Sequence, residues 1–387
     1  MAPAYAVLDV DVRLVAKPLE SVEEGGVGGS SKPIYEALRW ALASDSEGDE
    51  DDYEPTGVVD WVRRGTVSLV ADNPAAGPPA ICTLSLHLPA TPREIEGHLG
   101  SVRVISADKN LLVLSTGPRF YYAASSGHYL VYDAAADGLI AAPPINWYEF
   151  REIFGRGPVV VHRGGGDHGS SDFILAELVL SRRTERHSVL LWSHASTASA
   201  GGQGQWARHD VRLPRDVEGH AFFTDVAFAF QGRWACWVDL SLGILMCDVL
   251  SPEPGLLLVP LPEDYQKHSF VRGRRTMYCT VGCTAGVIKF LYMDGYTDDD
   301  DDDCRSWDQV TIATWTLQEL PAQDPSRWQW RKDDDRELRV GDLWADESFL
   351  AIPGLPRRAP MCPVLSPKEL DTVYFGPVRF QAGVDLR

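Results

Sequence analysis

Four Cys and His residues between positions 268 and 304 are of types that ligate metal ions. Cys279 and Cys283 lie four positions apart, with His268 upstream and Cys304 downstream. A structural zinc site usually takes two close pairs of ligands, and this stretch has one loose pair. The alternative is that both thiols lie in or beside a strand and help to fill its apolar face. We favour that interpretation and expect neither a metal nor a cofactor.

Six consecutive aspartates, Asp298 to Asp303, follow Asp294 and could attract calcium through their carboxylate oxygens. An EF-hand loop spaces its ligands and needs a central glycine and a terminal glutamate, and neither is in register here. The run is more typical of a solvated loop, as is a second acidic run between Asp45 and Glu54.

The segment from His162 to Asp172 brings His, Asp and Ser together in a glycine-rich stretch. A nucleophilic serine would normally lie in a G-x-S-x-G elbow between a strand and a helix, and a phosphate loop would end in Gly-Lys-Ser/Thr. Neither pattern is present, so the segment predicts a loop between strands. We expect no catalytic residue here and no enzymatic activity.

Several of the 12 tryptophans could stack on sugars or bases. Trp237 and Trp315 lie in apolar strand-like runs, where a large ring would fill the space between neighbouring sheets. Trp328 and Trp330 differ, because alternate residues of a strand share a face and the basic Arg331 lies beside them. These three residues are a speculative binding surface, with core packing as the alternative.

The overall composition and net charge indicate which classes of partner the chain is expected to bind. The chain has 387 residues, and 55 acidic against 36 basic side chains give a formal charge of −19. Such a field repels phosphate backbones and anionic lipid, so we expect no nucleic acid and no membrane. The first residues resemble neither a secretory signal nor a transit peptide, and the odd number of cysteines indicates reduced thiols. We expect a monomer in the cytoplasm, the nucleus or both.

The stretch from Trp234 to Leu250 predicts a β-hairpin with its turn at Asp239 to Gly243, and similar units of about 40 to 50 residues recur along the chain. Units of this length with three or four strands are typical of a β-propeller. The fold class expected is all-β, with a large β-sandwich as the competing architecture. The expected blade starts are Gly57, Val102, Val159, Thr224, Thr276 and Arg339.

These starts give six blades, or seven if the N-terminal strand takes part in closure. The last unit reads as two strands, so we expect a strand from before Gly57 to complete it and close the ring. Residues 1–56 would hold that strand, a short helix from Ile34 to Ala43 and an acidic loop, and residues 57–387 the propeller, in a single domain overall.

The central hairpin carries a further signature, W-V-D-L-x-x-G-I-L-x-C-D-V-L. It is matched here by Trp237, Val238, Asp239, Leu240, Gly243, Ile244, Leu245, Cys247, Asp248, Val249 and Leu250. On these residues the chain resembles the plant family, expanded in grasses, known as domain of unknown function 1618 (DUF1618). DWVRRGTVSLVADN near the start, GVIKFLYMD, the WTL segment at Trp315 and PVLSPKELDTVYF extend the resemblance to roughly Gly57 to Val378.

The resemblance implies no catalytic residue, because the family has no agreed activity. It implies a β-rich domain similar to the propeller-like domains that follow F-box motifs in ubiquitin-ligase substrate receptors, although residues 1–56 carry no F-box pattern. We therefore expect an uncharacterised, acidic, non-enzymatic propeller that binds proteins through its rim loops. The alternative is a propeller enzyme or carbohydrate binder that uses the central channel.

Overall fold

The structure is a computed structural model in which strands make up most of the described residues, so the all-β class is confirmed. It describes residues 7–8, 11–16, 67–72, 81–88, 101–117, 129–143, 145, 157–163, 172–180, 186–194, 205–218, 220–266, 275–295, 307–318, 328–333, 338–351, 357, 360–375 and 382–385. The chain forms two compact units, which we describe one at a time.

The first unit comprises residues 1–105 and 110–149. Its described strands form one sheet in the order β1-β4-β2-β5-β6-β7-β8, with β3 paired to β4. Their bounds are β1 Val7–Leu8, β2 Asp11–Ala16, β3 Ser68–Asp72, β4 Ile81–Leu88, β5 Ser101–Asp108, β6 Leu111–Gly117, β7 Tyr129–Asp133 and β8 Gly138–Ala141. Apolar side chains such as Leu86, Leu114 and Leu130 form its core.

The second unit comprises residues 150–387 together with residues 106–109. Three successive groups of four strands each form an antiparallel meander in chain order. The first is β9 Val159–His162, β10 Phe173–Val179, β11 His187–His194 and β12 Ala207–Val211. The second is β13 Val226–Phe230, β14 Trp234–Asp239, β15 Gly243–Asp248 and β16 Leu256–Pro260. The third is β17 Cys279–Thr284, β18 Val287–Asp294, β19 Thr311–Gln318 and β20 Gln329–Lys332.

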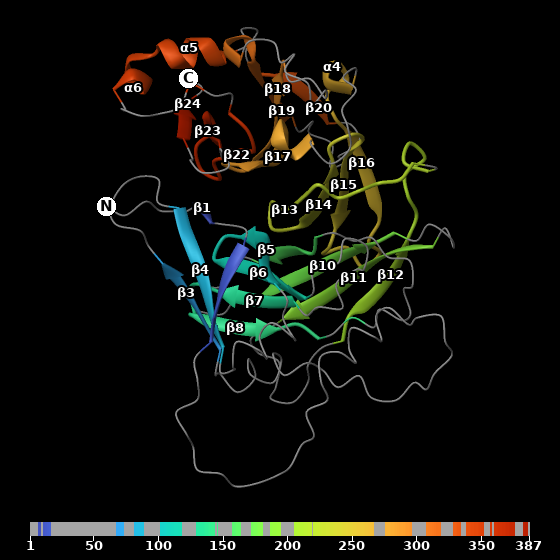
Figure 1. The fold of residues 1–387 in the computed structure, drawn as a ribbon. Coiled ribbons are helices and arrows are strands. Elements are labelled where there is room, and N and C mark those ends of the chain that lie inside the picture. Colours follow the sequence, from blue (N-terminus) through green and yellow to red (C-terminus); the bar gives the residue numbers. More distant parts are fainter. Residues whose placement is uncertain are drawn as a thin grey trace, which may run out of the picture. The chain divides into compact units, whose positions relative to one another are not determined.

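A fourth sheet of β22 Pro363–Leu365, β23 Thr372–Phe375 and β24 Ala382–Asp385 follows in the second unit. Short elements connect it to the third sheet: β21 Leu338–Arg339, which pairs with β19, and the helices α5 Val340–Ala345 and α6 Glu347–Leu350. Two single turns of 3-10 helix, η2 Arg275–Met277 and η3 Trp307–Gln309, and the helix α4 Glu263–Gln266 complete the unit (Figure 1).

The first strands of successive sheets lie against one another. Strand β13 contacts β9 on one side and β17 on the other, and β17 contacts β22. A backbone hydrogen bond of 2.9 Å from the Ala285 nitrogen to the Pro367 oxygen joins the turn after β17 to the turn after β22. The sheets of the second unit are therefore stacked in chain order.

The hydrophobic core of this unit lies between the sheets. Alternate residues of β14 point to opposite faces. Trp234 and Cys236 belong to a cluster shared with β17 and β18, whereas Ala235 and Trp237 belong to a cluster shared with β9 and β10. Because both faces of this sheet are covered, every residue of β14 is buried, and apolar residues replace the usual apolar-polar alternation.

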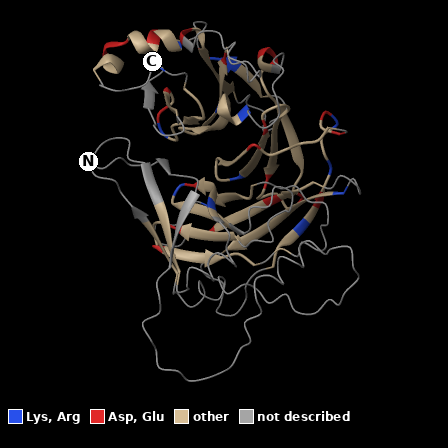
Figure 2. Ribbon diagram, in the orientation of Figure 1, with Lys and Arg blue, Asp and Glu red and all other residues tan. Residues whose placement is uncertain are grey.

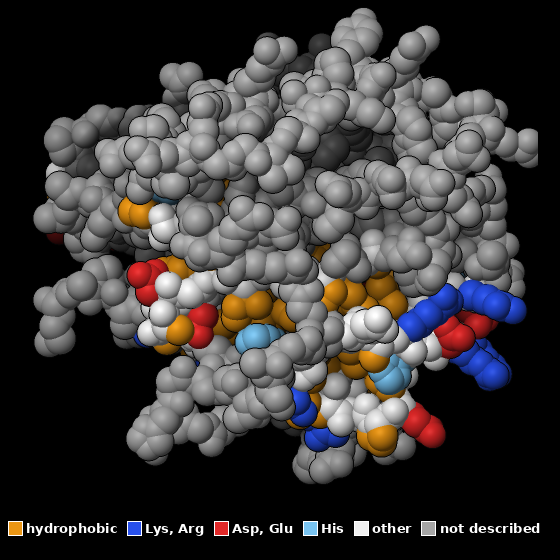
Figure 3. Space-filling model, turned by 90° about the horizontal axis from the view of Figure 1, so that it is seen from below, with side chains coloured by type: hydrophobic (Ala, Val, Ile, Leu, Met, Phe, Trp, Pro, Cys, Tyr) orange, Lys and Arg blue, Asp and Glu red, His pale blue; other side chains and the backbone are white. Residues whose placement is uncertain are grey.

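Charged residues lie largely outside these interiors. In Figure 2 the strands of the second unit are mostly uncharged, and Asp and Glu gather at turns and along α5 and α6. On the face seen in Figure 3, Lys and Arg side chains of the described residues lie next to Asp and Glu side chains, so both signs of charge are mixed there.

The hairpin predicted from Trp234 to Leu250 is confirmed, with β14 and β15 joined through residues 240–242. Four of the expected unit starts, Val102, Val159, Thr224 and Thr276, lie within three residues of β5, β9, β13 and β17. The expected helix from Ile34 to Ala43 and both acidic runs lie outside the described residues.

Two details of the expected closure differ from the structure. The N-terminal strands β1 and β2 pair with β4 and β5, and β24 completes the last sheet. Arg339 does not begin a sheet, because the segment after it forms α5 and α6, with the Asp346 side chain capping α6. A closed ring is not seen in the described residues, so the number of blades and the closure stay predictions, as does the division into residues 1–56 and 57–387.

Candidate functional site

The turn of the central hairpin is held by a buried carboxylate. Asp239 is 2% exposed, and its oxygens accept hydrogen bonds from the Phe223 backbone nitrogen at 2.8 Å, from the Ser241 backbone nitrogen at 2.8 Å, and from the Ser241 hydroxyl. Asp225, just before β13, acts in a similar way, because its carboxylate accepts from the Leu240 nitrogen at 2.9 Å. Both carboxylates are thus used to fix the backbone of the turn.

Trp237 and Gly243 are explained by packing. The Trp237 side chain is fully buried, and its indole nitrogen donates a hydrogen bond of 2.9 Å to the Gly157 carbonyl oxygen. A Cβ atom at Gly243 would lie 2.5 Å from the carbonyl oxygen of Val259 on the neighbouring strand, so a side chain has no room there.

The remaining residues of the signature also contribute to packing and to the local backbone structure. Ile244 and Cys247 are fully buried on opposite faces of β15, and burial, with a smaller contribution from the Asp248 charge, raises the pKa of the Cys247 thiol to about 12. Asp248 accepts a hydrogen bond from the Leu250 nitrogen at 3.1 Å and pairs with Arg233, whose pKa it raises through that hydrogen bond and its charge.

The three residues of the speculative binding surface lie at the end of the third meander. Trp328 is buried, and Trp330 packs on the same core cluster and donates from its indole nitrogen to the Pro260 oxygen at 2.7 Å. Only Arg331 is exposed. The two rings share one face, as the alternation predicted, and that face is directed into the core.

The other residues considered for chemistry are held by local contacts. The Cys279 thiol donates to the Arg275 carbonyl oxygen at 3.1 Å and lies 3.4 Å from the Tyr265 hydroxyl, and burial raises its pKa to about 12. The His162 backbone nitrogen donates to the Asp108 carboxylate at 2.8 Å, and burial raises the pKa of that carboxyl. Within the described ranges, no three His, Cys, Asp or Glu side chains are grouped to hold a metal ion. His268, Cys304 and the glycine-rich residues 164–171 lie outside these ranges.

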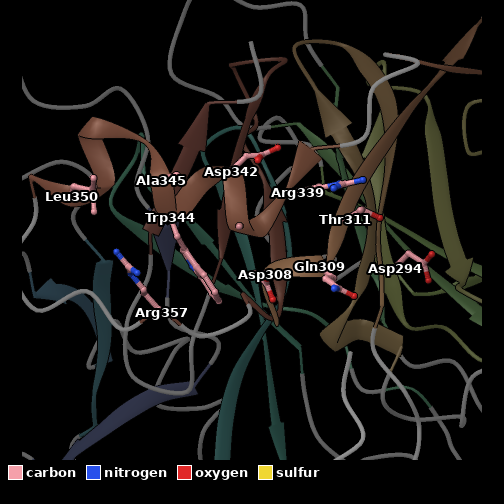
Figure 4. Close-up of a pocket in the computed structure, with 11 residues that line it drawn as sticks. Asp294, Asp308, Gln309, Thr311, Arg339, Asp342, Trp344, Ala345, Leu350 and Arg357 are labelled. Carbon is pink, nitrogen blue, oxygen red and sulfur yellow. The ribbon is translucent and has the colours of Figure 1, made fainter. Parts of the chain in front are cut away.

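A cavity of about 960 Å³ lies in the second unit between the end of β18, η3, β21 and the helices α5 and α6. We call it the α5–α6 cavity. In Figure 4, Leu350, Ala345, Trp344 and Arg357 lie at one end, Asp294, Gln309, Thr311 and Arg339 at the other, and Asp308 and Asp342 between them.

Backbone contacts give the α5–α6 cavity its shape. The Val340 nitrogen donates to the Val310 oxygen at 2.9 Å, which holds the start of α5 against the strand after η3. A Cβ atom at Gly341 would lie 2.8 Å from the Asp308 carbonyl oxygen, so glycine permits the close approach of α5 to η3. Asp346 then begins α6 by accepting from the Ser348 nitrogen at 2.8 Å, and its bonds to the Ser348 hydroxyl and nitrogen lower the pKa of its carboxyl.

Four of the charged side chains that line the α5–α6 cavity have no polar partner among the described residues. Asp308, Asp342, Arg339 and Arg357 are all exposed, and among the described residues none of their side chains makes a hydrogen bond or an ion pair. Asp294 differs, because it accepts hydrogen bonds from the Gly295 nitrogen at 2.8 Å and the Tyr292 hydroxyl at 3.3 Å. Four charged groups of both signs therefore line the same cavity as the half-buried Trp344.

A second, smaller cavity of about 300 Å³ is lined by His220, Ala221, Ser241, Leu242 and Arg275. The Ser241 hydroxyl is already committed to Asp239. The α5–α6 cavity is the larger and more polar of the two, and it is the candidate site.

Part of the chain matches a known protein family. Residues 237–374 match the family described as "Protein of unknown function (DUF1618)". The match supports the family resemblance read from the hairpin signature, and begins at Trp237 within that signature. It is shorter than the span of Gly57 to Val378 that the sequence motifs suggested. No curated protein matches the chain significantly.

The sequence motifs did not reveal the candidate site. Its residues are spread from Asp294 to Arg357, and no two of its opposite charges form a motif with a known chemistry. The one sequence signal is the polar stretch after Arg339, which has charged residues on either side of Trp344 but predicts the start of a strand unit.

The longest helix described in the second unit, α5, has 6 residues, and no helix in the described part of the chain is long and apolar enough to cross a bilayer.

Proposed function

We propose that this chain is a β-propeller that binds other proteins and is not an enzyme, and that the α5–α6 cavity is its binding site. The observation that carries the proposal is that four exposed charged side chains line the same cavity as Trp344 and have no hydrogen-bond or ion-pair partner among the described residues. Binding surfaces of proteins combine aromatic anchors with polar groups that await a partner.

The order of the sheets supports the propeller. In a propeller each blade is a four-stranded antiparallel meander, and the first strands of successive blades lie side by side around the axis. Strands β9, β13, β17 and β22 contact one another in that order, and apolar clusters fill the spaces between their sheets. An experimental structure in which these sheets form two face-to-face layers would contradict this part of the proposal.

The use of polar groups supports binding over catalysis. Catalytic side chains are held within about 0.5 Å of the productive geometry by neighbouring hydrogen bonds. At the central hairpin the Asp239 and Asp225 carboxylates are held in this way, but by backbone groups of the turn and of Phe223. In the α5–α6 cavity the Asp308 and Asp342 carboxylates have no hydrogen-bond partner among the described residues, and such groups suit ordering by a bound partner.

Site-specific photo-crosslinking tests the proposal. A photoreactive amino acid replaces Ala345, an exposed residue of the cavity, and in a matched variant replaces Glu218, an exposed residue of the turn before β13. Each full-length variant is irradiated in extract of the cells that express the protein. We expect discrete protein adducts from position 345 that are absent from position 218. Equal labelling at the two positions would contradict a binding site at the cavity.

A further inference from the structure

We propose that the α5–α6 cavity recognises an extended peptide segment in which one Lys or Arg side chain lies next to an apolar side chain. This inference rests on the proposed function and specifies the partner's chemistry. The volume of about 960 Å³ is near the upper end of ligand pockets, which span roughly 300–1,000 Å³, so it has room for several side chains.

The carboxylates that line the cavity favour a basic residue in the bound peptide. Three carboxylates, Asp294, Asp308 and Asp342, line it. Asp308 and Asp342 have no ion-pair partner among the described residues, so a Lys or Arg of the partner would not have to displace an existing pair. The formal charge of −19 adds a long-range attraction for a cationic segment.

Leu350 and Trp344, which line the cavity, favour a hydrophobic residue next to the basic residue of the peptide. The Leu350 side chain of α6 is 56% exposed, and Trp344 of α5 lines the same cavity. An aliphatic side chain would remove Leu350 from water, and the indole face would interact favourably with a nearby cation.

The two arginines limit how basic the segment can be. Arg339 and Arg357 also line the cavity and are unpaired in the described residues. A second and a third basic residue would meet these guanidinium groups, and like charges at an interface are repulsive. A backbone carbonyl or a single acidic residue of the partner would instead accept their hydrogen bonds. A polybasic tail is therefore disfavoured.

Synthetic peptides on a neutral Gly-Ser background test this inference with the full-length protein. One carries a single Lys next to Leu, a second carries Glu next to Leu, and a third carries Gln next to Leu. A fourth carries a run of Lys without Leu. We expect the Lys-Leu peptide to bind most tightly in fluorescence anisotropy, and its affinity to fall about tenfold in the double variant Asp308→Asn with Asp342→Asn.

Matched variants keep the test specific. Glu218→Gln removes an exposed carboxylate elsewhere in the unit and should leave binding of the Lys-Leu peptide unchanged. Trp344→Ala should weaken binding of the Lys-Leu peptide, and Arg339→Gln should improve binding of the polylysine peptide. Because all of these side chains are exposed or half-buried, the variants should fold, and circular dichroism checks that they do.

The outcomes separate the two proposals. If the Glu-Leu or polylysine peptide binds the wild type as tightly as the Lys-Leu peptide, or if the double Asn variant binds Lys-Leu unchanged, the inferred chemistry is wrong. The proposed function would survive that result if crosslinking from position 345 still gave discrete adducts. It would fail separately if those adducts were missing.

Discussion

Two regions of the second unit use their polar groups in opposite ways. In the central hairpin the carboxylates of Asp239 and Asp225 bond to backbone nitrogens of the turn, and the Trp237 indole bonds to a backbone carbonyl. Around the α5–α6 cavity, Asp308 and Asp342 bond to nothing in the described residues. The carboxylates of the signature hairpin thus hold the backbone of its turn, whereas those of Asp308 and Asp342 have no such role in the described residues, although both regions lie within the family match.

The largest expected difference between buried and exposed regions is in thiol reactivity. Burial raises the pKa of Cys247 to about 12, so at pH 8 only about one molecule in ten thousand has this thiolate. Cys362 is exposed. In native protein, iodoacetamide should label Cys362 at least about a hundredfold faster than Cys247, as followed by peptide mass spectrometry. Similar labelling rates would show that the hairpin is open to solvent.

The second largest difference is expected in the unfolding free energy that is lost when a tryptophan of each region is replaced by alanine. Trp237→Ala leaves a cavity between two sheets and should lower the free energy of unfolding by about 3–5 kcal/mol in urea titrations. Trp344→Ala, at the α5–α6 cavity, should cost about 1 kcal/mol or less, because that ring is only half-buried. Equal losses would contradict the comparison. Trp237→Phe, which keeps most of the ring, isolates the hydrogen bond to Gly157, worth about 1 kcal/mol.

Within the hairpin sheet, two glycine-to-alanine substitutions should differ in their effect on stability. Gly243→Ala forces a methyl group against the Val259 carbonyl and should cost about 1–3 kcal/mol through displacement of β16. At Gly255, just before the same strand, a Cβ atom meets nothing within 4 Å, so Gly255→Ala should change stability by less than about 0.5 kcal/mol. The measurement is again the unfolding free energy, and a tolerated Gly243→Ala would be evidence against the close packing of β15 on β16.

The smallest effect concerns the start of α6 and depends on pH. Hydrogen bonds from Ser348 lower the pKa of the Asp346 carboxyl below 3.8, so the ionised form stabilises the folded helix. A lowered pKa means that this contribution is present above the unfolded value and is lost as the pH falls through the folded value. The Ser348 amide should therefore exchange faster at acidic pH, relative to its intrinsic rate, and Asp346→Ala should remove that dependence. An unchanged pH dependence in the variant would assign it to another group.

The part of the fold set by local patterns could be predicted from the sequence. In the segment Trp234 to Leu250 apolar runs flank Asp239 and Gly243, and the turn forms where those residues predict it. Pairings between distant segments could not be predicted in this way. Strand β2 runs parallel to β4, which is far away in the sequence, and no local pattern specifies that partner.

The candidate site was harder to predict than the fold, for a similar reason. Asp294 and Arg357, which are 63 positions apart, line one cavity whose shape depends on the close approach of α5 to η3 at Gly341. In the sequence, Trp328 and Trp330 suggest a binding surface, because two aromatic rings lie close to Arg331. The same alternation that places both rings on one face directs them into the core between the second and third sheets.

Hydrogen exchange measured by mass spectrometry tests most directly whether the signature hairpin is enclosed while the α5–α6 cavity is exposed. Amides in peptides covering residues 234–248 should exchange only through global unfolding, because both faces of that sheet are covered. Amides in peptides covering residues 340–350 should exchange far earlier through local opening of two short helices. If the hairpin exchanged as fast as the helices, the hairpin would not be the enclosed centre of the second unit.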